Sequence, residues 1–300
     1  MATVSEIEIE TETEKPAEKK PWPQSLAKMI RRQPLGAAGA VIVIAMFLMA
    51  AFADFITVYD PELNAFEDML LPPGDQYFLG TDQFGRDVLT RIIYGSRTAL
   101  LVGFSGAFMG AFTGLVLGVA SAYFGGRFDL LFQRVMDVFL AFPLIIMALA
   151  IVSIFGPGLE NVIIAITIPF IPQCARVVRS NALAIREIPY VDAARALGFG
   201  HARIILRHMV PNVMAPFLIM LSTFVGHAIL LEASLSYLGL GVAEPTPAWG
   251  LMLQGGAEEY AESAPWMAIW PGVAISIAVF GFNLFGDALR DVLDPKLRSL

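Results

Sequence analysis

Long charge-free stretches of apolar residues run along the sequence and predict membrane-spanning helices. Five of them are long enough for one crossing each, because a helix needs about 20 mostly apolar residues to cross the hydrocarbon core. They lie between Arg32 and Asp54, Arg97 and Arg127, Asp137 and Glu160, Arg207 and Glu232, and Glu262 and Asp287. A sixth stretch, between Glu160 and Arg176, is shorter and contains two prolines. It can cross if its two flanking charges lie at the membrane interfaces.

The distribution of basic residues favours six crossings with both termini in the cytoplasm. In that topology the cytoplasmic segments are 1–34, 123–134, 176–208 and 287–300, which hold 17 of the 20 lysines and arginines. Cytoplasmic loops of membrane proteins carry such an excess of basic residues. Without the sixth stretch, the six arginines of 176–208 would lie outside. The sequence therefore predicts an all-α membrane protein with six transmembrane helices.

The same pattern divides the chain into segments. We expect a disordered cytoplasmic tail (1–28), a first transmembrane helix (29–56), a periplasmic segment (57–97), a five-helix core (98–290) with a cytoplasmic loop at 176–210, and a cytoplasmic tail (291–300). The first tail holds six glutamates within twenty residues and does not resemble a secretory signal. Only 16% of the chain is charged, against about 25% in soluble domains, which also indicates a lipid environment.

Four glycines recur at every fourth position of the second apolar stretch: Gly106, Gly110, Gly114 and Gly118. This spacing places them along one face of a helix, where a neighbouring backbone can approach closely. Two interpretations stay open. The glycine face is either a seam that slides or dimerises, or a site of static packing, which is common in membrane bundles.

Five prolines lie in or beside the predicted spans, and each is expected to bend or break its helix because proline removes a backbone donor. They are Pro143, Pro169, Pro172, Pro216 and Pro271. Such breaks suit a protein with a polar pathway, although proline is also more frequent in transmembrane helices generally.

Ionisable residues near the span ends are candidates for a polar pathway. Glu232 lies close to the outer end of the fifth span if that helix extends to Tyr237, and it is the leading candidate for a carboxylate that lines the pathway. His227 is expected to be a hydrogen-bonded interior histidine. Arg134 and Asp137 are three residues apart, so we expect a local ion pair between them.

Several kinds of chemistry have no signature in the sequence. No Gly-Lys pair occurs, so the chain has no phosphate-binding loop of the nucleotide-hydrolase type. The three histidines form no two-turn metal pair, and the single Cys174 excludes an internal disulfide. We expect this chain to bind no cofactor or metal; if ATP drives its activity, another chain must bind the nucleotide.

Two classes of membrane protein can be compared with the sequence at this point. Gly103-Phe104-Ser105-Gly106 resembles the Gly-x-Ser-Gly of rhomboid intramembrane serine proteases, with His227 as the conceivable base. The sequence around His227 lacks the rhomboid pattern, and Gly106 already belongs to the glycine series. Replacing Ser105 with alanine would abolish turnover of a protease but leave transport intact. A secondary transporter would show inverted repeats, which the hydropathy does not reveal.

Residues 189–198 predict a short helix on the cytoplasmic side. Pro189 opens it, Asp192 lies in its first turn, alanines fill it and Gly198 ends it. Its small side chains give it a thin body that could enter a groove on a partner protein. The alternative is an amphipathic helix that rests on the lipid headgroups.

This loop resembles that of the dipeptide, oligopeptide and nickel permeases of ATP-binding-cassette (ABC) importers. Their pattern is Glu-Ala-Ala, three residues, Gly, nine residues, then Ile-x-Leu-Pro. The chain matches this pattern at Ala193, Ala194, Gly198 and Pro211. It has Asp192 where the pattern has Glu, His208 where it has Ile, and Val210 where it has Leu. The segments 79–87 (LGTDQFGRD) and 236–250 (SYLGLGV through PAWG) also resemble this family, so the likeness covers most of the chain after residue 25.

The resemblance implies the type I ABC importer permease fold in the inner membrane. Such a permease pairs with a second permease, two cytoplasmic ATPases that hold ATP and Mg²⁺, and an external solute-binding protein. Together they import peptides, nickel or related small solutes by alternating access, and this chain catalyses no reaction itself. The short helix would be the coupling helix that docks into an ATPase cleft. By resemblance, its coupling residues are Tyr190, Asp192, Ala193, Ala194, Leu197, Gly198 and Pro211.

Overall fold

The computed structural model describes residues 33–293, and every structural statement below concerns these residues. The chain divides into two units, Met1–Pro34 and Leu35–Leu300, and the first is described only at its last two residues. The predicted tail 1–28 therefore lies outside the described residues, as does 294–300 of the predicted tail 291–300.

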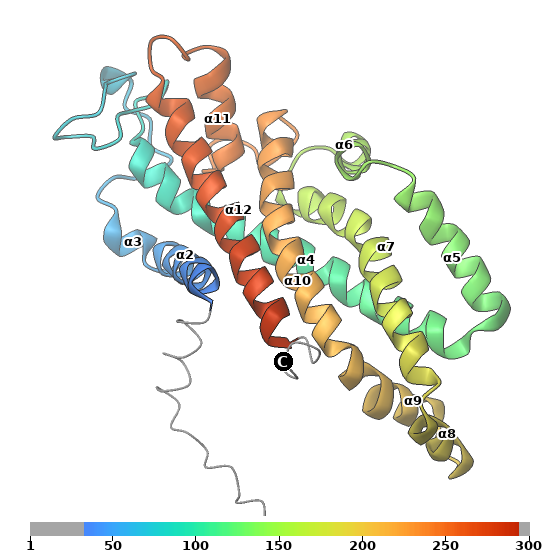
Figure 1. Ribbon diagram of the computed structural model, residues 1–300. Coiled ribbons are helices and arrows are strands. Elements are labelled where there is room, and N and C mark those ends of the chain that lie inside the picture. The colour runs from blue at the N-terminus through green and yellow to red at the C-terminus, as the bar shows by residue number, and fades with distance from the viewer. Residues whose placement is uncertain (1–32, 294–300) are drawn as a thin grey trace, which may run out of the picture. The chain divides into compact units, whose positions relative to one another are not determined.

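The second unit is built from helices (Figure 1). The longer helices are α2 (Pro34–Ala51), α4 (Val88–Phe124), α5 (Gly126–Leu140), α6 (Leu144–Phe155), α7 (Leu159–Arg186), α10 (Val210–Tyr237), α11 (Trp249–Glu258) and α12 (Trp266–Leu293). Shorter ones are α3 (Ala53–Ile56), η1 (Phe66–Asp68), α8 (Pro189–Ala196), α9 (His201–Ile204) and the π-helical segment η2 (Ile205–Met209). Between residues 33 and 293 the only β pairing is one isolated bridge, between Thr81 and Asp87.

Five helical stretches are long and apolar enough to cross a membrane: α2, α4, α7, α12 and the stretch His201–Tyr237, in which α9, η2 and α10 follow one another directly. A sixth candidate is the pair α5 and α6, which meet at an 88° bend. The predicted six crossings therefore agree with the structure when this bent pair counts as one. The third predicted span is not straight, because Pro143 precedes α6 and the residues before it leave the helix.

At two predicted segment boundaries helices continue past the charged residues, and the boundaries themselves stay predictions because a helix can extend beyond the membrane. α4 begins at Val88, inside the predicted periplasmic segment 57–97, and α7 continues to Arg186 within the predicted loop 176–210. The other four prolines lie inside α7, α10 and α12 without ending them. Packing against neighbouring helices supports proline inside transmembrane helices.

The centre of this unit is formed by α4, α7, α10 and α12. The largest interface joins α4 to α7, and α10 packs against α4, α7 and α12. The rings of Phe170 on α7 and Phe224 on α10, both fully buried, stack with their centroids 4.3 Å apart. We call the end of the bundle that carries α8 the α8 end, and the opposite end the α11 end (Figure 1).

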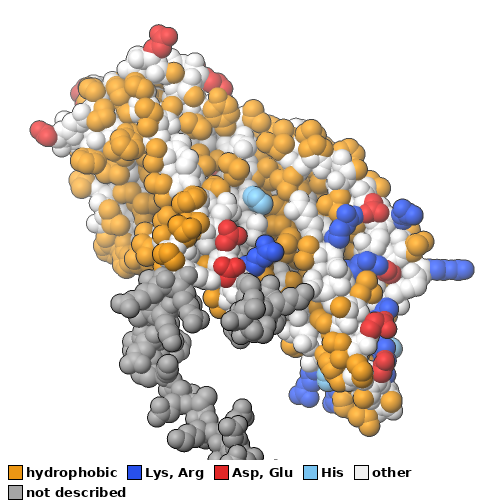
Figure 2. Space-filling model, viewed as in Figure 1, with side chains coloured by type: hydrophobic (Ala, Val, Ile, Leu, Met, Phe, Trp, Pro, Cys, Tyr) orange, Lys and Arg blue, Asp and Glu red, His pale blue; other side chains and the backbone are white. Residues whose placement is uncertain are grey.

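Charged side chains are concentrated at the two ends. Hydrophobic side chains cover most of the face shown in Figure 2, and many of its lysines and arginines gather toward the end where α8 and α9 lie. Two ion pairs join α5 to α7, Asp129 with Arg179 and Asp137 with Arg176. The predicted pair between Arg134 and Asp137 is wrong, because the bend after α5 lets that helix run beside α7 and brings Arg176 to Asp137.

Candidate coupling and transport sites

The short helix α8 has a defined end at its C-terminal side. The N–H of Gly198 donates to the carbonyl of Arg195 at 2.9 Å, and the N–H of Phe199 donates to that of Ala194 at 3.1 Å. Gly198 has a φ of +76°. These two bonds and the left-handed residue form a Schellman cap, in which glycine avoids the penalty that a Cβ would carry. Pro189 occupies the first turn, as the sequence predicted.

One side of α8 faces the protein and the other is open. Val191 and Ala194 are buried, whereas Asp192, Ala193 and Leu197 are exposed, Leu197 at 74%. Asp192 pairs with Arg195 one turn later at 2.9 Å. Of the predicted coupling residues, Ala194 thus turns inward, and the exposed ones are Tyr190, Asp192, Ala193, Leu197, Gly198 and Pro211. The helix presents a small, mostly apolar knob that the rest of the described chain leaves uncovered.

Aromatic contacts hold α8 against the start of α10. The Tyr190 hydroxyl donates to the carbonyl of His208 at 3.1 Å and accepts from Nδ2 of Asn212 at 3.0 Å. The ring of His208 lies nearly parallel to that of Phe199, with centroids 6.2 Å apart. His208 stands where the family pattern has isoleucine, and its ring here makes the packing contact that an apolar side chain would make.

Further polar contacts tie this region to the end of α4. The Tyr123 hydroxyl lies 2.7 Å from Nδ1 of His201, and Arg186 Nη1 donates to the carbonyl of Ala122 at 2.7 Å. The guanidinium of Arg195 lies over the Tyr123 ring at 5.7 Å. A displacement of α8 would therefore be transmitted to α4 and α10 through direct contacts, without a flexible linker.

The glycine face of α4 lies against α7. A Cβ at Gly106 would stand 2.9 Å from Cγ2 of Ile166, and one at Gly110 would stand 2.6 Å from Cβ of Phe170. The same addition at Gly114 or Gly118 would meet atoms of α7 at 2.6 Å. Within this chain the face is filled by α7, so the geometry is that of close packing and leaves no free surface for dimerisation.

Adding a methyl group to this face is expected to destabilise the protein. Gly110→Ala forces α4 and α7 apart, and overpacking of this kind costs about 1–3 kcal/mol. Gly272→Ala is the matched control, because its nearest neighbour would be Cδ1 of Leu253 at 3.9 Å. Thermal unfolding of the two detergent-solubilised variants measures the difference. Equal apparent Tm values would contradict close packing at Gly110.

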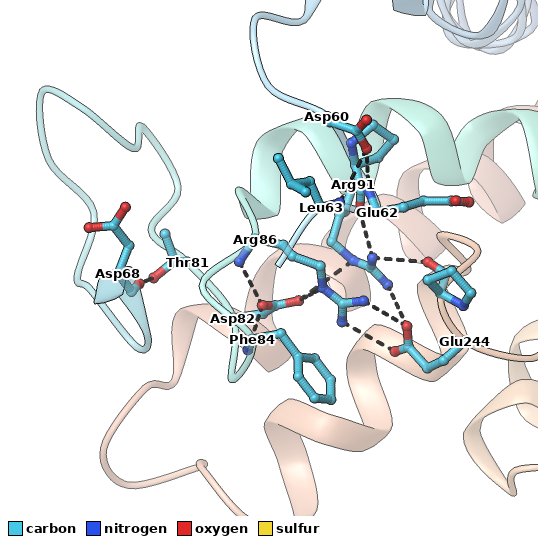
Figure 3. Close-up of polar contacts among 12 residues, drawn as sticks. Asp60, Glu62, Leu63, Asp68, Thr81, Asp82, Phe84, Arg86, Arg91 and Glu244 are labelled. Carbon is cyan, nitrogen blue, oxygen red and sulfur yellow. Dashed lines mark hydrogen bonds and ion pairs between the residues drawn. The ribbon is translucent and has the colours of Figure 1, made fainter. Parts of the chain in front are cut away.

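At the α11 end, a cluster of charges that is buried except at Glu244 joins two distant segments. This arginine cluster consists of Asp82, Arg86, Arg91 and Glu244 (Figure 3). Arg86 pairs through Nε with Asp82 at 2.7 Å and through Nη1 with Glu244, 158 positions along the chain, at 2.7 Å. Burial opposes the charged form of Arg86, but the Glu244 and Asp82 carboxylates outweigh it and raise its pKa. Arg86 is therefore held as a cation.

Arg91 completes the cluster from the first turn of α4. Its side chain is 1% exposed, and Nη1 donates to the carbonyls of Pro61 at 2.8 Å and Pro245 at 3.2 Å. Its Nη2 lies 3.5 Å from Oε2 of Glu244. Arg91 thus fixes the 57–87 segment and the 239–248 segment to α4 at once (Figure 3).

Other contacts attach the same two segments to the bundle. Nε1 of Trp249 donates to the carbonyl of Ile92 at 2.9 Å, and Oγ1 of Thr98 donates to that of Pro247 at 2.8 Å. Within the 57–87 segment, the Tyr77 hydroxyl donates to Asp68 at 2.8 Å, which raises the pKa of Tyr77 to about 12. The two family-like segments at 79–87 and 236–250 therefore form one structural unit, although they lie far apart in the sequence.

The candidate pathway residue Glu232 is buried. Its side chain is 1% exposed and accepts a hydrogen bond from Ser236 Oγ at 2.7 Å. It faces no open space in this conformation, and its pathway role stays a prediction. His227, on the same helix, is exposed, so the expectation of an interior histidine is wrong for this chain by itself.

The alternative catalytic arrangement finds no support among the described residues. Gly103, two positions before Ser105, packs on Ile229 of α10, and a Cβ there would stand 2.9 Å from its Cγ1. No hydrogen bond joins Ser105 to His227 in residues 33–293. In the same range, no group of three metal-ligating side chains could hold a metal ion.

The long apolar helices, with charged groups at both ends of the bundle, define a multi-pass helical membrane protein. Residues 114–299 match the family described as binding-protein-dependent transport system inner membrane component. Residues 20–73 match the N-terminal transmembrane domain of oligopeptide transport permease C. The chain belongs to this family of ABC importer permeases, in which separate subunits hydrolyse ATP.

Relatives with similarity along most of their length support this assignment. A putative peptide transport system permease of Brucella suis biovar 1 is 43% identical over 272 residues, 91% of each chain. The dipeptide transport system permease DppC of Alkalihalophilus pseudofirmus is 40% identical, covering 93% of this chain and 91% of the relative. A glutathione transport system permease, GsiD, of Pectobacterium atrosepticum is 38% identical, covering 93% and 92%.

Solved structures confirm the fold. A chain of the MetNI methionine ABC transporter, in an inward-facing conformation, aligns with a TM-score of 0.54 and 20% identity. The alignment covers 68% of this chain and 96% of that chain. A second crystal form aligns with a TM-score of 0.55 and 19% identity. The fold is that of a type I ABC importer permease, as the sequence resemblance implied, and ATPase and substrate-binding partners follow from the family.

Proposed function

We propose that this chain pairs with a second, homologous permease to form the pathway of a peptide importer. Peptides are favoured as the solute because relatives at 43% and 40% identity are named for peptide and dipeptide transport. The α8 end faces the cytoplasm, in keeping with its arginines and the positive-inside rule, and both termini lie on that side. The chain itself binds no nucleotide; ATP and Mg²⁺ belong to the two ATPase partners.

The observation that carries the mechanism is the exposed knob of α8 on a firmly anchored base. In the proposed cycle, ATP closes the ATPase pair, each ATPase carries a docked α8 with it, and the contacts to α4 and α10 turn the pathway outward. Hydrolysis reverses the movement. Moving such a switch from 1:99 to 99:1 takes about 5.5 kcal/mol of differential binding, which ATP-driven closure supplies more readily than weak solute binding.

A crosslinking experiment tests the docking of α8. Ala193→Cys, on the exposed side, is expected to crosslink to an ATPase subunit in intact membrane vesicles when a short reagent with one thiol-reactive and one photoreactive end is added and irradiated. Ala194→Cys is the matched control, because that side chain is only 4% exposed and points toward the protein. Absence of any Ala193→Cys product with an assembled importer, or equal crosslinking of both variants, would count against the docking role.

A further inference from the structure

Most of the surface that the spans expose is apolar, as expected for contact with lipid. On α4 the exposed side chains include Leu101, Phe108 and Phe112, each at about half exposure. On α12 one exposed stripe consists of Ile269, Val273, Ile277 and Phe280, spaced three or four residues apart. A polar side chain exposed at the same depth is therefore an exception.

One face of α10 carries such exceptions. His227, Leu230 and Ser234 follow one another at helical spacing, and His227 is exposed. Within the part of the chain that the structure describes, the His227 ring has no hydrogen-bond partner. His227 lies ten residues before Tyr237, where α10 ends, and so about 15 Å from the α11 end. That is near the middle of a hydrocarbon core about 30 Å thick.

A groove begins one turn away and reaches α12. It has a volume of about 490 Å³, and its lining from α10, α11 and α12 is mostly apolar, with Ser234, Tyr237 and Ser276 as its polar side chains. The hydroxyls of Ser234 and Ser276 donate to carbonyls of their own helices at 2.8 Å, which leaves their lone pairs free to accept. Ligand pockets usually measure about 300–1,000 Å³.

The His227 ring is unsuited to contact with lipid. An imidazole without a partner costs several kcal/mol in hydrocarbon, so ionisable residues inside a membrane usually face a water-filled cavity or another polar group. The exposed stripe of α12 is entirely apolar, as expected for a helix face in contact with lipid. The His227 face therefore borders a different environment from the Ile277 face.

We propose that His227 and Ser234 of α10, together with Ser276 of α12, line the solute pathway. In it, the His227 ring supplies one donor and one acceptor to the backbone of a passing peptide. The two serine oxygens accept from its amide N–H groups. This inference rests on the proposed function and assigns the pathway to a face other than that of the buried Glu232.

Thiol labelling in the assembled importer, in native membranes, tests the assignment. His227→Cys and Ser276→Cys are treated with a hydrophilic, membrane-impermeant maleimide, which reacts with the thiolate and therefore requires water at the site. Ile277→Cys is the control, because it is the neighbour of Ser276, lies at similar depth and is 49% exposed on the apolar stripe. The unaltered chain gives the baseline, because Cys174 is fully buried.

We expect both pathway thiols to react at least about tenfold faster than the Ile277→Cys thiol, and a transported dipeptide in excess to slow them. If all three thiols are labelled at equal rates in an importer that still takes up peptide, the pathway assignment is overturned and the proposed function is not. Fast labelling of the two pathway thiols in an importer that takes up no peptide would support the pathway and overturn the proposed solute. If His227→Cys inserts poorly, Ser276→Cys still tests the assignment, because cysteine is nearly the same size and shape as serine.

Discussion

Arg86→Ala is expected to lower the apparent Tm of the solubilised protein by about 10 °C, the largest loss of stability predicted for this chain. Arg86 is 3% exposed and holds both Asp82 and Glu244 at 2.7 Å. Its removal leaves Asp82 and Glu244 only their longer contacts to Arg91, at 3.7 and 3.5 Å, and breaking a buried pair from one side costs about 3–5 kcal/mol. A loss of that size shifts the Tm of a protein of this length by several degrees or more.

Arg97→Ala is the matched control for this prediction. Arg97 also forms an ion pair, with Asp54 at 2.9 Å, but both side chains are partly exposed. Exposed pairs contribute little, so the apparent Tm of this variant should be close to that of the unaltered protein. Fluorescence-detected thermal unfolding in one detergent compares the two. If Arg86→Ala and Arg97→Ala have the same apparent Tm, the arginine cluster does not hold the two segments in place.

Features set by local sequence could be predicted well. The short helix at 189–198 depends on a proline at its start and a glycine at its end, and both lie within ten residues of each other. The glycine series on α4 likewise encodes a packing face through helical periodicity alone. Long apolar stretches predict crossings because length and composition decide whether a helix can span the bilayer.

Features set by distant partners could not be predicted in this way. Nothing near Arg86 in the sequence indicates that Glu244 is its partner, because the two meet only after the bundle forms. The 88° bend between α5 and α6 is a second case, since hydropathy reports how apolar a segment is and not its direction. The exposure of His227 is a third, because it depends on which face of α10 the other helices cover.

Gly198→Val is expected to reduce peptide uptake by at least about tenfold while the variant still inserts and folds. A Cβ at Gly198 would meet no atom within 4 Å, so the substitution creates no clash. The obstacle is the backbone, because φ is +76° and a β-branched residue is strongly disfavoured there. The cap of α8 would open, and the exposed Leu197 and Ala193 would no longer be presented in one fixed arrangement.

Gly200→Val separates this effect from the added bulk. Gly200 lies two positions later, is equally exposed, has no neighbour within 4 Å of an added Cβ and adopts an ordinary extended conformation, with φ −64°. Uptake of a labelled dipeptide and ATP hydrolysis are measured together in vesicles that contain the complete importer. Gly198→Val should lower uptake per ATP hydrolysed, and Gly200→Val should not. Equal uptake by the two variants would show that transport does not depend on the capped form of α8, and coupling would then have to pass through another contact.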